Sequence, residues 1–145
     1  MKVILKTKNK LRNYRESQIE IKVRGYHLDV YQHVNNARYL ELLEEGRWAH
    51  YEGRLESDFF TQNKLGMVVV NNNINYHYPA TLGEVLIVKT KIEHVGNKSV
   101  RFRQQLFLKG SDKLVIDASV TFVILDMKAT KSVLIEGKIL EMLVS

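Results

Sequence analysis

Cysteine is absent from the 145-residue chain. Without a thiol there is no disulfide, no thiolate metal site and no cysteine nucleophile, so packing and hydrogen bonds alone must hold the fold. Compact histidine spacings such as HExxH are also missing, and no metal site is expected. The phosphate-binding loop, GxGxxG and GxSxG motifs do not occur either, so the usual signatures of nucleotide binding and of a serine hydrolase are lacking.

Long hydrophobic runs are missing as well. Charges interrupt the apolar runs near the start of the chain, and nowhere do about 18 apolar residues follow one another. We therefore expect neither a membrane span nor a secretory signal, and we expect a cytoplasmic protein. Proline occurs once and glycine 8 times, without a linker or repeat to mark a domain boundary. A hydrophobic content of 45% at this length is typical of one domain.

Basic side chains outnumber acidic ones by 22 to 16, which gives a formal net charge of +6. Much of the excess lies in residues 1–18, which we interpret as a basic arm or extra element before a single domain at 19–145. The charge favours anionic partners, either nucleic acid or a phosphate-rich small molecule such as CoA. Nucleic-acid binding needs exposed aromatic groups among the cations, but Tyr76 and Phe102 fall on the predicted buried face, so no nucleic-acid partner is expected.

Alternation of apolar and polar residues predicts an antiparallel sheet. Residues 19–23 form the first expected strand, and four later segments alternate in the same way. Their predicted buried residues are Val68, Val70, Ile74, Tyr76 and Tyr78; Leu86, Val88 and Ile92; Val100, Phe102, Leu106 and Leu108; and Leu114, Ile116, Ala118, Val120, Phe122 and Ile124. Three-residue turns at 96–98 and 110–112 would keep these faces together, which predicts an antiparallel meander.

One long helix precedes those four segments. Residues 37–52 are mostly good helix formers, with Gly46 as the exception, and Asn35 or Asn36 can cap the helix. Acidic side chains form one narrow strip on it: Glu41, Glu45 and Glu52. Because apolar groups cover most of the remaining circumference, we expect the sheet to wrap the helix. The predicted fold class is α+β, with one long central helix inside a bent antiparallel sheet of about five strands.

The segment before this helix, residues 25–39, concentrates ionisable and amide side chains. A helix start exposes about four unpaired N–H groups and the positive end of the dipole, which suits a carbonyl that becomes an oxyanion, and Asn36 lies there. Asp29 would serve as nucleophile or general base, or would form an Asx-turn. His27 and His33 flank the loop, and either would relay a proton or orient its neighbours.

Other charged residues are open to two interpretations. Glu44 lies between Leu40 and Trp48 on the apolar helix face, where an acid needs a partner. Arg47 would supply one in a buried or interface ion pair, and the alternative is a catalytic acid. On the outer face of the predicted sheet, four cations form a basic patch that would meet phosphates or solvent: Lys89, Lys91, Arg101 and Arg103.

Two segments resemble a known family. Residues 23–53, VRGYHLDVYQHVNNARYLELLEEGRWAHYEG, resemble the 4-hydroxybenzoyl-CoA thioesterase-like branch of the hot-dog superfamily. Residues 76–84, YHYPATLGE, resemble that family's strand end and turn. The resemblance implies a helix wrapped by an antiparallel sheet, the arrangement that the alternation also predicts. It further implies hydrolysis of acyl-CoA or acyl-carrier-protein thioesters, without a cofactor beyond the CoA of the substrate.

The resemblance also implies roles for individual residues. Asp29 matches the family's catalytic aspartate, and Asn36 matches the residue whose backbone N–H polarises the thioester carbonyl. Tyr39 and Glu44 match a tyrosine and a glutamate of the family's helix. The candidate catalytic residues are Asp29, Asn36, His33 and Glu44, and the candidate substrate-binding residues are Asn35, Tyr39, Lys89, Lys91, Arg101 and Arg103.

The His-Val-Asn-Asn sequence at 33–36 is closer to fatty-acyl thioesterases than to the benzoyl type, so a fatty acyl group is expected. The resemblance implies a homodimer or homotetramer with the site at the subunit interface. Two alternatives of the same fold remain: a non-catalytic acyl-CoA-binding protein, and a hydratase that would use His33 with Glu44.

Overall fold

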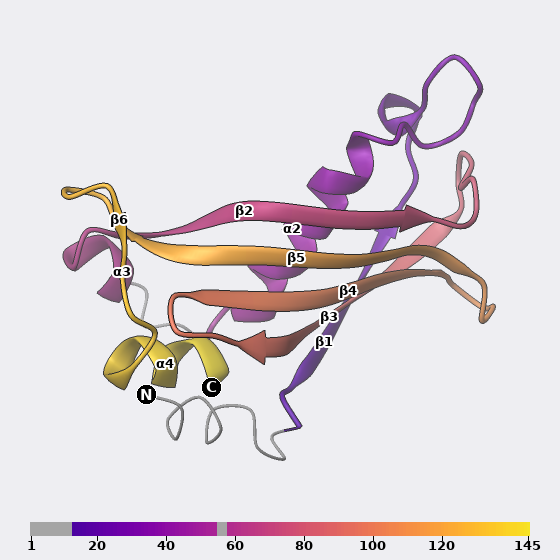
Figure 1. Ribbon diagram of the computed structural model, residues 1–145. Coiled ribbons are helices and arrows are strands. Elements are labelled where there is room, and N and C mark those ends of the chain that lie inside the picture. The colour runs from indigo at the N-terminus through magenta and orange to yellow at the C-terminus, as the bar shows by residue number, and fades with distance from the viewer. Residues whose placement is uncertain (1–12, 55–57) are drawn as a thin grey trace.

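The computed structural model describes residues 13–54 and 58–145, and Figure 1 shows their arrangement. Most of the arm expected at residues 1–18 lies outside the described residues. The elements in chain order are β1 (Glu16–Lys22), η1 (Gly25–His27), α2 (Arg38–Tyr51), α3 (Phe59–Gln62), β2 (Leu65–Tyr76), β3 (Val85–Val95), β4 (Ser99–Leu108), β5 (Leu114–Asp126), β6 (Lys131–Ser132) and α4 (Gly137–Val144). No helix in these two ranges is long and apolar enough to cross a membrane.

The strands form one antiparallel sheet in the order β1-β3-β4-β5-β2, and the short β6 pairs with β5. The predicted meander is confirmed for β3, β4 and β5, which are consecutive in the chain and adjacent in the sheet. Helix α2 packs against β1 and β3 on one face of the sheet. The expected bent antiparallel sheet of five main strands is therefore present, and α2 is the longest helix of the described residues.

The β3–β4 hairpin differs from the prediction in its turn. Val95 pairs with Val100, so the turn has four residues rather than three. A β-bulge between Ile92 and His94 absorbs the extra residue and returns the apolar side chains to one face. Before the bulge the pairing is regular, with Lys89 opposite Gln105 and Lys91 opposite Arg103.

Helix α2 approaches the sheet closely at Gly46. A Cβ atom at this position would lie 2.7 Å from Val88 Cγ1, 2.9 Å from Thr90 Oγ1 and 3.0 Å from Gln104 Nε2. Gln104 is fully buried, and its Nε2 donates to the carbonyl oxygen of Leu43 and to Thr90 Oγ1. The helix and the sheet are thus joined by a glycine contact and by a buried amide whose hydrogen bonds are satisfied on both elements.

Strand β2 contradicts the predicted burial pattern. Val68, Val70 and Tyr76 were expected inside, but their exposed fractions are 37%, 57% and 51%. The strand lies at the edge of the sheet and pairs only with β5 among the described strands. From Met67 to Val70 every residue is apolar, so apolar side chains point to both faces of the strand. Whichever face turns inward, the apolar side chains of the other face remain uncovered. A hydrophobic edge strand of this kind is a template for pairing with another chain.

The α2 helix is also less enclosed than the sequence predicted. Leu40 is 40% exposed and Trp48 is 70% exposed. Leu42 and Leu43 are buried, and Gly46 lies against β3. The sheet therefore covers one side of α2, and the side that carries Leu40 and Trp48 lies open beside β2.

The buried side chain of His50, near the end of α2, is expected to make the stability of the protein depend on pH. Its side chain is only 3% exposed, and Nδ1 lies 2.7 Å from Ser17 Oγ. Burial, with the nearby charges of Arg15 and Arg54, lowers the pKa of His50 to about 4 from its usual 6.5. The unfolded chain therefore binds one more proton than the folded chain between these two pH values. We expect the free energy of unfolding to fall by about 3 kcal/mol as the pH drops from 6.5 to 4.

Urea unfolding at a series of pH values measures this loss. The control is His50→Gln, which keeps a hydrogen-bonding side chain near Ser17 but does not titrate. Other acid-sensitive groups affect both proteins equally, so the difference between the two curves isolates His50. Parallel curves for the two proteins between pH 6.5 and 4 would contradict the assignment.

Candidate active site

The loop before α2 is held at both ends. Leu28 and Val34 form a β-bridge, and His33 forms another with Thr81 in the turn before β3. The Val34 N–H donates to the carbonyl oxygen of Ala80 over 2.9 Å. Gln32, near the tip, has a positive φ of 63°, which closes the turn at some conformational cost. The two resembling segments are thereby joined in space, and Asp29 is fixed relative to the start of α2.

Asp29 is half-buried in this loop. Its Oδ1 accepts a 2.9 Å hydrogen bond from the Tyr31 N–H, which is an Asx-turn. Its backbone N–H donates to the carbonyl oxygen of His33. Within residues 13–54 and 58–145, no hydrogen bond reaches Oδ2. One oxygen therefore shapes the loop, while the other is available to a water molecule or a substrate.

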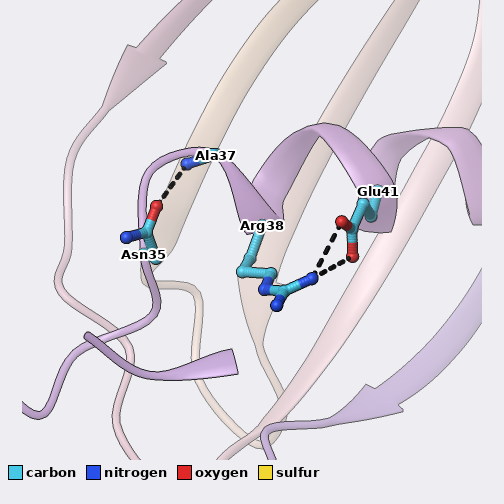
Figure 2. Close-up of polar contacts among 4 residues, drawn as sticks. All are labelled: Asn35, Ala37, Arg38 and Glu41. Carbon is cyan, nitrogen blue, oxygen red and sulfur yellow. Dashed lines mark hydrogen bonds and ion pairs between the residues drawn. The ribbon is translucent and has the colours of Figure 1, made fainter. Parts of the chain in front are cut away.

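Asn35 forms the turn that leads into α2. Its Oδ1 accepts a 2.9 Å hydrogen bond from the Ala37 N–H, and its carbonyl oxygen accepts another from Arg38 N–H. Figure 2 shows this turn beside the ion pair of Arg38 with Glu41, in which Nη1 lies 2.9 Å from Oε1. The sequence allowed Asn35 or Asn36 as the cap, but the residue at the cap position is Ala37, whose side chain cannot accept a hydrogen bond.

Asn36 is thereby left with a free N–H group. The residue is exposed, and its carbonyl oxygen accepts a 3.2 Å hydrogen bond from Tyr76 Oη. Its N–H has no acceptor in the part of the chain that the structure describes. An unpaired, accessible N–H at the positive end of a helix is suited to bind a carbonyl oxygen that gains negative charge.

Tyr39 and His27 are buried around this helix start. Burial raises the pKa of Tyr39 to about 12, so its hydroxyl stays protonated near neutral pH. The ring of Tyr39 meets that of Tyr76 edge-on at 5.8 Å. His27 Nδ1 accepts a hydrogen bond from the Arg24 N–H, and burial lowers the pKa of this histidine. His27 is thus a neutral side chain that orders the loop, whereas His33 is only half-buried.

Glu44 lies away from the loop. It is eight residues beyond Asn36, a rise of about 12 Å along a helix. Contrary to expectation, Glu44 is exposed, and its Oε1 lies 3.4 Å from the Trp48 Nε1 donor. Arg47 donates instead to Gln104 Oε1 over 2.9 Å, so the ion pair predicted between Glu44 and Arg47 is wrong. The candidate catalytic residues therefore divide into a group at the helix start and Glu44 alone.

A cavity of about 600 Å³ lies beside Glu44, between α2, α3 and β2. Its lining residues are Glu44, Arg47, Trp48, Tyr51, Phe60, Thr61, Leu65, Met67, Val68, Val69 and Phe122. Apart from Glu44, the sequence did not identify these residues as part of a site. The signal was present in the run Met67–Val70, because a strand that is apolar on both faces must be covered on both.

The basic patch lies on the other face of the sheet. Successive side chains of β3 and β4 point to opposite faces of the sheet. Thr90 and Gln104 point toward Gly46 of α2, so the cations beside them in the sequence point away from α2. Each cation has a partner: Lys89 lies over the Phe107 ring, Lys91 donates to Asn13, Arg101 pairs with Glu93, and Arg103 lies 3.7 Å from Asp117. A role in holding CoA phosphates stays a prediction for these four residues.

Comparison with known proteins shows where this arrangement recurs. Residues 23–143 match the model of a family described as the thioesterase-like superfamily. The chain is 46% identical over 126 residues to the long-chain acyl-CoA thioesterase FadM of Escherichia coli, covering 87% of this chain and 96% of FadM. The chain belongs to the thioesterase-like superfamily. More distant relatives include the acyl-acyl carrier protein thioesterase ATL2 of Arabidopsis thaliana, 28% identical over 77% of this chain and 60% of its own.

Solved structures agree with this membership of the thioesterase-like superfamily. A probable thioesterase from Escherichia coli, YbaW, superposes with a TM-score of 0.82 at 45% identity, covering 88% of this chain and 98% of its own. A 1,4-dihydroxy-2-naphthoyl-CoA thioesterase from Synechocystis superposes with a TM-score of 0.73 at 16% identity, covering 84% and 90%, and shows the fold alone. The hot-dog fold and the family that the resemblance implied are both confirmed.

Proposed function

We propose that this member of the thioesterase-like superfamily hydrolyses long-chain fatty acyl-CoA to a free fatty acid and CoA. The observation that carries the proposal is the 46% identity to a long-chain acyl-CoA thioesterase over nearly the whole of both chains. The helix start supports it independently, because the Asn36 N–H and the second oxygen of Asp29 are both free of partners among the described residues. The reaction needs no cofactor beyond the CoA of the substrate.

In this proposal the thioester carbonyl oxygen accepts a hydrogen bond from the Asn36 N–H at the start of α2. The helix dipole there favours the negative charge that develops on this oxygen. Asp29 takes a proton from water, the water oxygen bonds to the carbonyl carbon, and the carbon–sulfur bond breaks. The proton held by Asp29 passes to the departing sulfur, which leaves as the CoA thiol. In the alternative route Asp29 attacks directly and water then cleaves the acyl-aspartate. Label found in Asp29 after a single turnover in ¹⁸O-labelled water would establish the second route, because only water attack on the aspartyl carbonyl of an acyl-aspartate places it there.

Thiol release from a panel of acyl-CoAs tests the function. We expect turnover of fatty acyl-CoAs and a higher kcat/KM for long chains than for benzoyl-CoA. Acyl-carrier-protein thioesters belong in the same panel, since two relatives cleave them by name. Tight acyl-CoA binding without turnover would favour the non-catalytic binding protein. Hydration of an enoyl-CoA without thiol release would favour the hydratase.

We further propose that two copies pair through β2. The edge strand is apolar from Met67 to Val70 and unpaired on one side within the described sheet, and Trp48 of α2 faces its first residues across the cavity. Pairing would satisfy the free backbone groups of β2 and cover exposed apolar side chains of that strand, such as Val70. The resemblance to the hot-dog family implies the same assembly.

Val70→Asp tests this pairing. Val70 is 57% exposed and does not line the cavity, so the folded monomer tolerates a charge there. In the proposed pair the two aspartates would lie in an apolar contact, where an unpaired charge is costly. Light scattering should give the parent twice the chain mass of 16.9 kDa and the variant that mass alone. A monomeric parent, or a dimeric variant, would contradict the proposed interface.

A further inference from the structure

We propose that the cavity between α2, α3 and β2 receives the methyl end of the acyl chain, and that α3 is the end wall that sets the longest chain accepted. This inference rests on the proposed function, because it assumes a thioester bound at the start of α2. It adds a binding site and a determinant of specificity, in which Phe60 and Thr61 of α3 line the far side of the cavity.

The relative direction of α2 and β2 places this cavity in line with the helix start. Tyr76 ends β2, and its hydroxyl donates to the carbonyl oxygen of Asn36 just before α2. The cavity lies at the opposite ends of both elements, where Trp48 faces the first residues of β2. The two elements therefore run antiparallel, and Figure 1 shows α3 at the end of β2 remote from the loop that carries Asp29.

The length of α2 sets how many carbons an acyl chain needs to reach the cavity. From Ala37 to Trp48 the helix rises by about 16 Å. An extended hydrocarbon chain advances about 1.3 Å per carbon, so about 8 carbons reach Glu44, the first lining residue of α2, and about 12 carbons reach Trp48. Leu40, one turn before Glu44, continues the cavity's side of α2 toward the helix start and remains 40% exposed. Chains of about 8 carbons would end at the near edge of the cavity, whereas chains of about 14 to 16 carbons would extend through it toward α3.

The chemistry of the lining suits a hydrocarbon end. Eight of the eleven lining residues are apolar or aromatic, and a volume of about 600 Å³ is ordinary for a small-molecule site. Arg47 lines the wall, but its guanidinium is held by Gln104, whose amide bonds to Leu43 and Thr90. The cation is thereby anchored toward the sheet and takes little part in the apolar space. Each methylene that enters such a space is worth roughly fourfold in affinity.

A matched pair of substitutions on α3 tests the end wall. Thr61 lines the cavity and its neighbour Gln62 does not, and both are exposed. Thr61→Phe should fill the cavity and lower the ratio of kcat/KM for palmitoyl-CoA over hexanoyl-CoA by about 10-fold or more, since several methylenes lose their place. Gln62→Phe adds the same ring on the same helix and should leave this ratio within about twofold.

Binding without turnover provides a second measurement. Trp48 is the only tryptophan of the chain and lines the cavity, so its fluorescence reports occupancy directly. S-hexadecyl-CoA, a thioether that cannot be hydrolysed, should shift Trp48 emission to the blue in the parent but much less in Thr61→Phe. S-hexyl-CoA should shift it in neither protein.

The outcomes separate this inference from the proposed function. A parent that hydrolyses acyl-CoA but keeps the same chain-length ratio in Thr61→Phe, with the same emission shift, overturns the end wall and leaves the function standing. A parent without thioesterase activity overturns the function, and the emission shift then decides alone whether the cavity takes long alkyl chains. Equal loss of the ratio in Thr61→Phe and Gln62→Phe would assign the effect to α3 as a whole and reject the cavity.

Discussion

Replacement of Asp29 by asparagine is expected to lower kcat/KM for fatty acyl-CoA by about 100-fold or more, because a positioned base or nucleophile typically contributes on this scale. Asparagine keeps a side-chain oxygen that accepts the Tyr31 N–H, so the Asx-turn and the loop should persist. The substitution therefore removes the carboxylate and little else. Steady-state thiol release measures the loss, and unfolding curves verify that the variant is folded.

The pattern of the kinetic change carries further information. If Asp29 acts in the transition state, kcat should fall about as much as kcat/KM, and KM should change little. Asp112→Asn is the matched control, since Asp112 is an exposed residue of the β4–β5 turn and forms none of the contacts described for the helix start. Equal rates for the parent and Asp29→Asn would reject Asp29 as the reacting carboxylate. Glu44 and His33 would then be the next residues to substitute.

Replacement of Gly46 by valine is expected to have the largest effect on stability, a loss of about 3 kcal/mol. The first added carbon alone would lie 2.7 Å from Val88 Cγ1 and 2.9 Å from Thr90 Oγ1. These neighbours belong to a central strand and cannot move without separating α2 from β3. The same displacement would stretch the bonds of Gln104, which joins the carbonyl of Leu43 to the sheet. Guanidinium unfolding should show a lower midpoint.

Helix propensity does not account for that loss, because valine is a slightly better helix former than glycine. Glu45→Val is the control: it introduces the same side chain one residue earlier, at an exposed position, and should cost less than about 1 kcal/mol. Similar midpoints for Gly46→Val and the parent would mean that α2 can shift on the sheet. Such a shift would also move Asn36 at the helix start.

The sequence predicted most of the sheet because alternation is a local signal. The inward residues of β3, β4 and β5, such as Val88, Phe102 and Phe122, are buried as expected. The loop motif was equally informative, because glycine, aspartate and asparagine at close spacing describe a turn and a helix start in one segment. Whether Asp29 catalyses or only shapes the loop is a separate matter, since an Asx-turn and a reactive carboxylate require the same residue.

The same local signal failed where the environment of a strand or helix face is set by distant parts of the chain. Val68 and Val70 alternate like the core strands, yet β2 lies at the sheet edge, because it pairs with β5 rather than with the next strand in the chain. Glu44 occupies the apolar face of α2 by periodicity, yet it is exposed beside a cavity and is not packed against a strand. Periodicity assigns a residue to a face but does not tell what packs against it.

The sequence by itself determined the fold class, the long helix, the antiparallel meander and the loop that holds Asp29 before Asn36, because each follows from contacts between residues close in the chain or from a motif of fixed spacing. Only the tertiary structure decided that β2 is an open edge, that Arg47 bonds to Gln104 and not to Glu44, and that α3 closes a cavity at the far end of α2. These features join residues separated by long stretches of chain, and the order of strands in a sheet is set by the packing of the whole molecule rather than by any one segment.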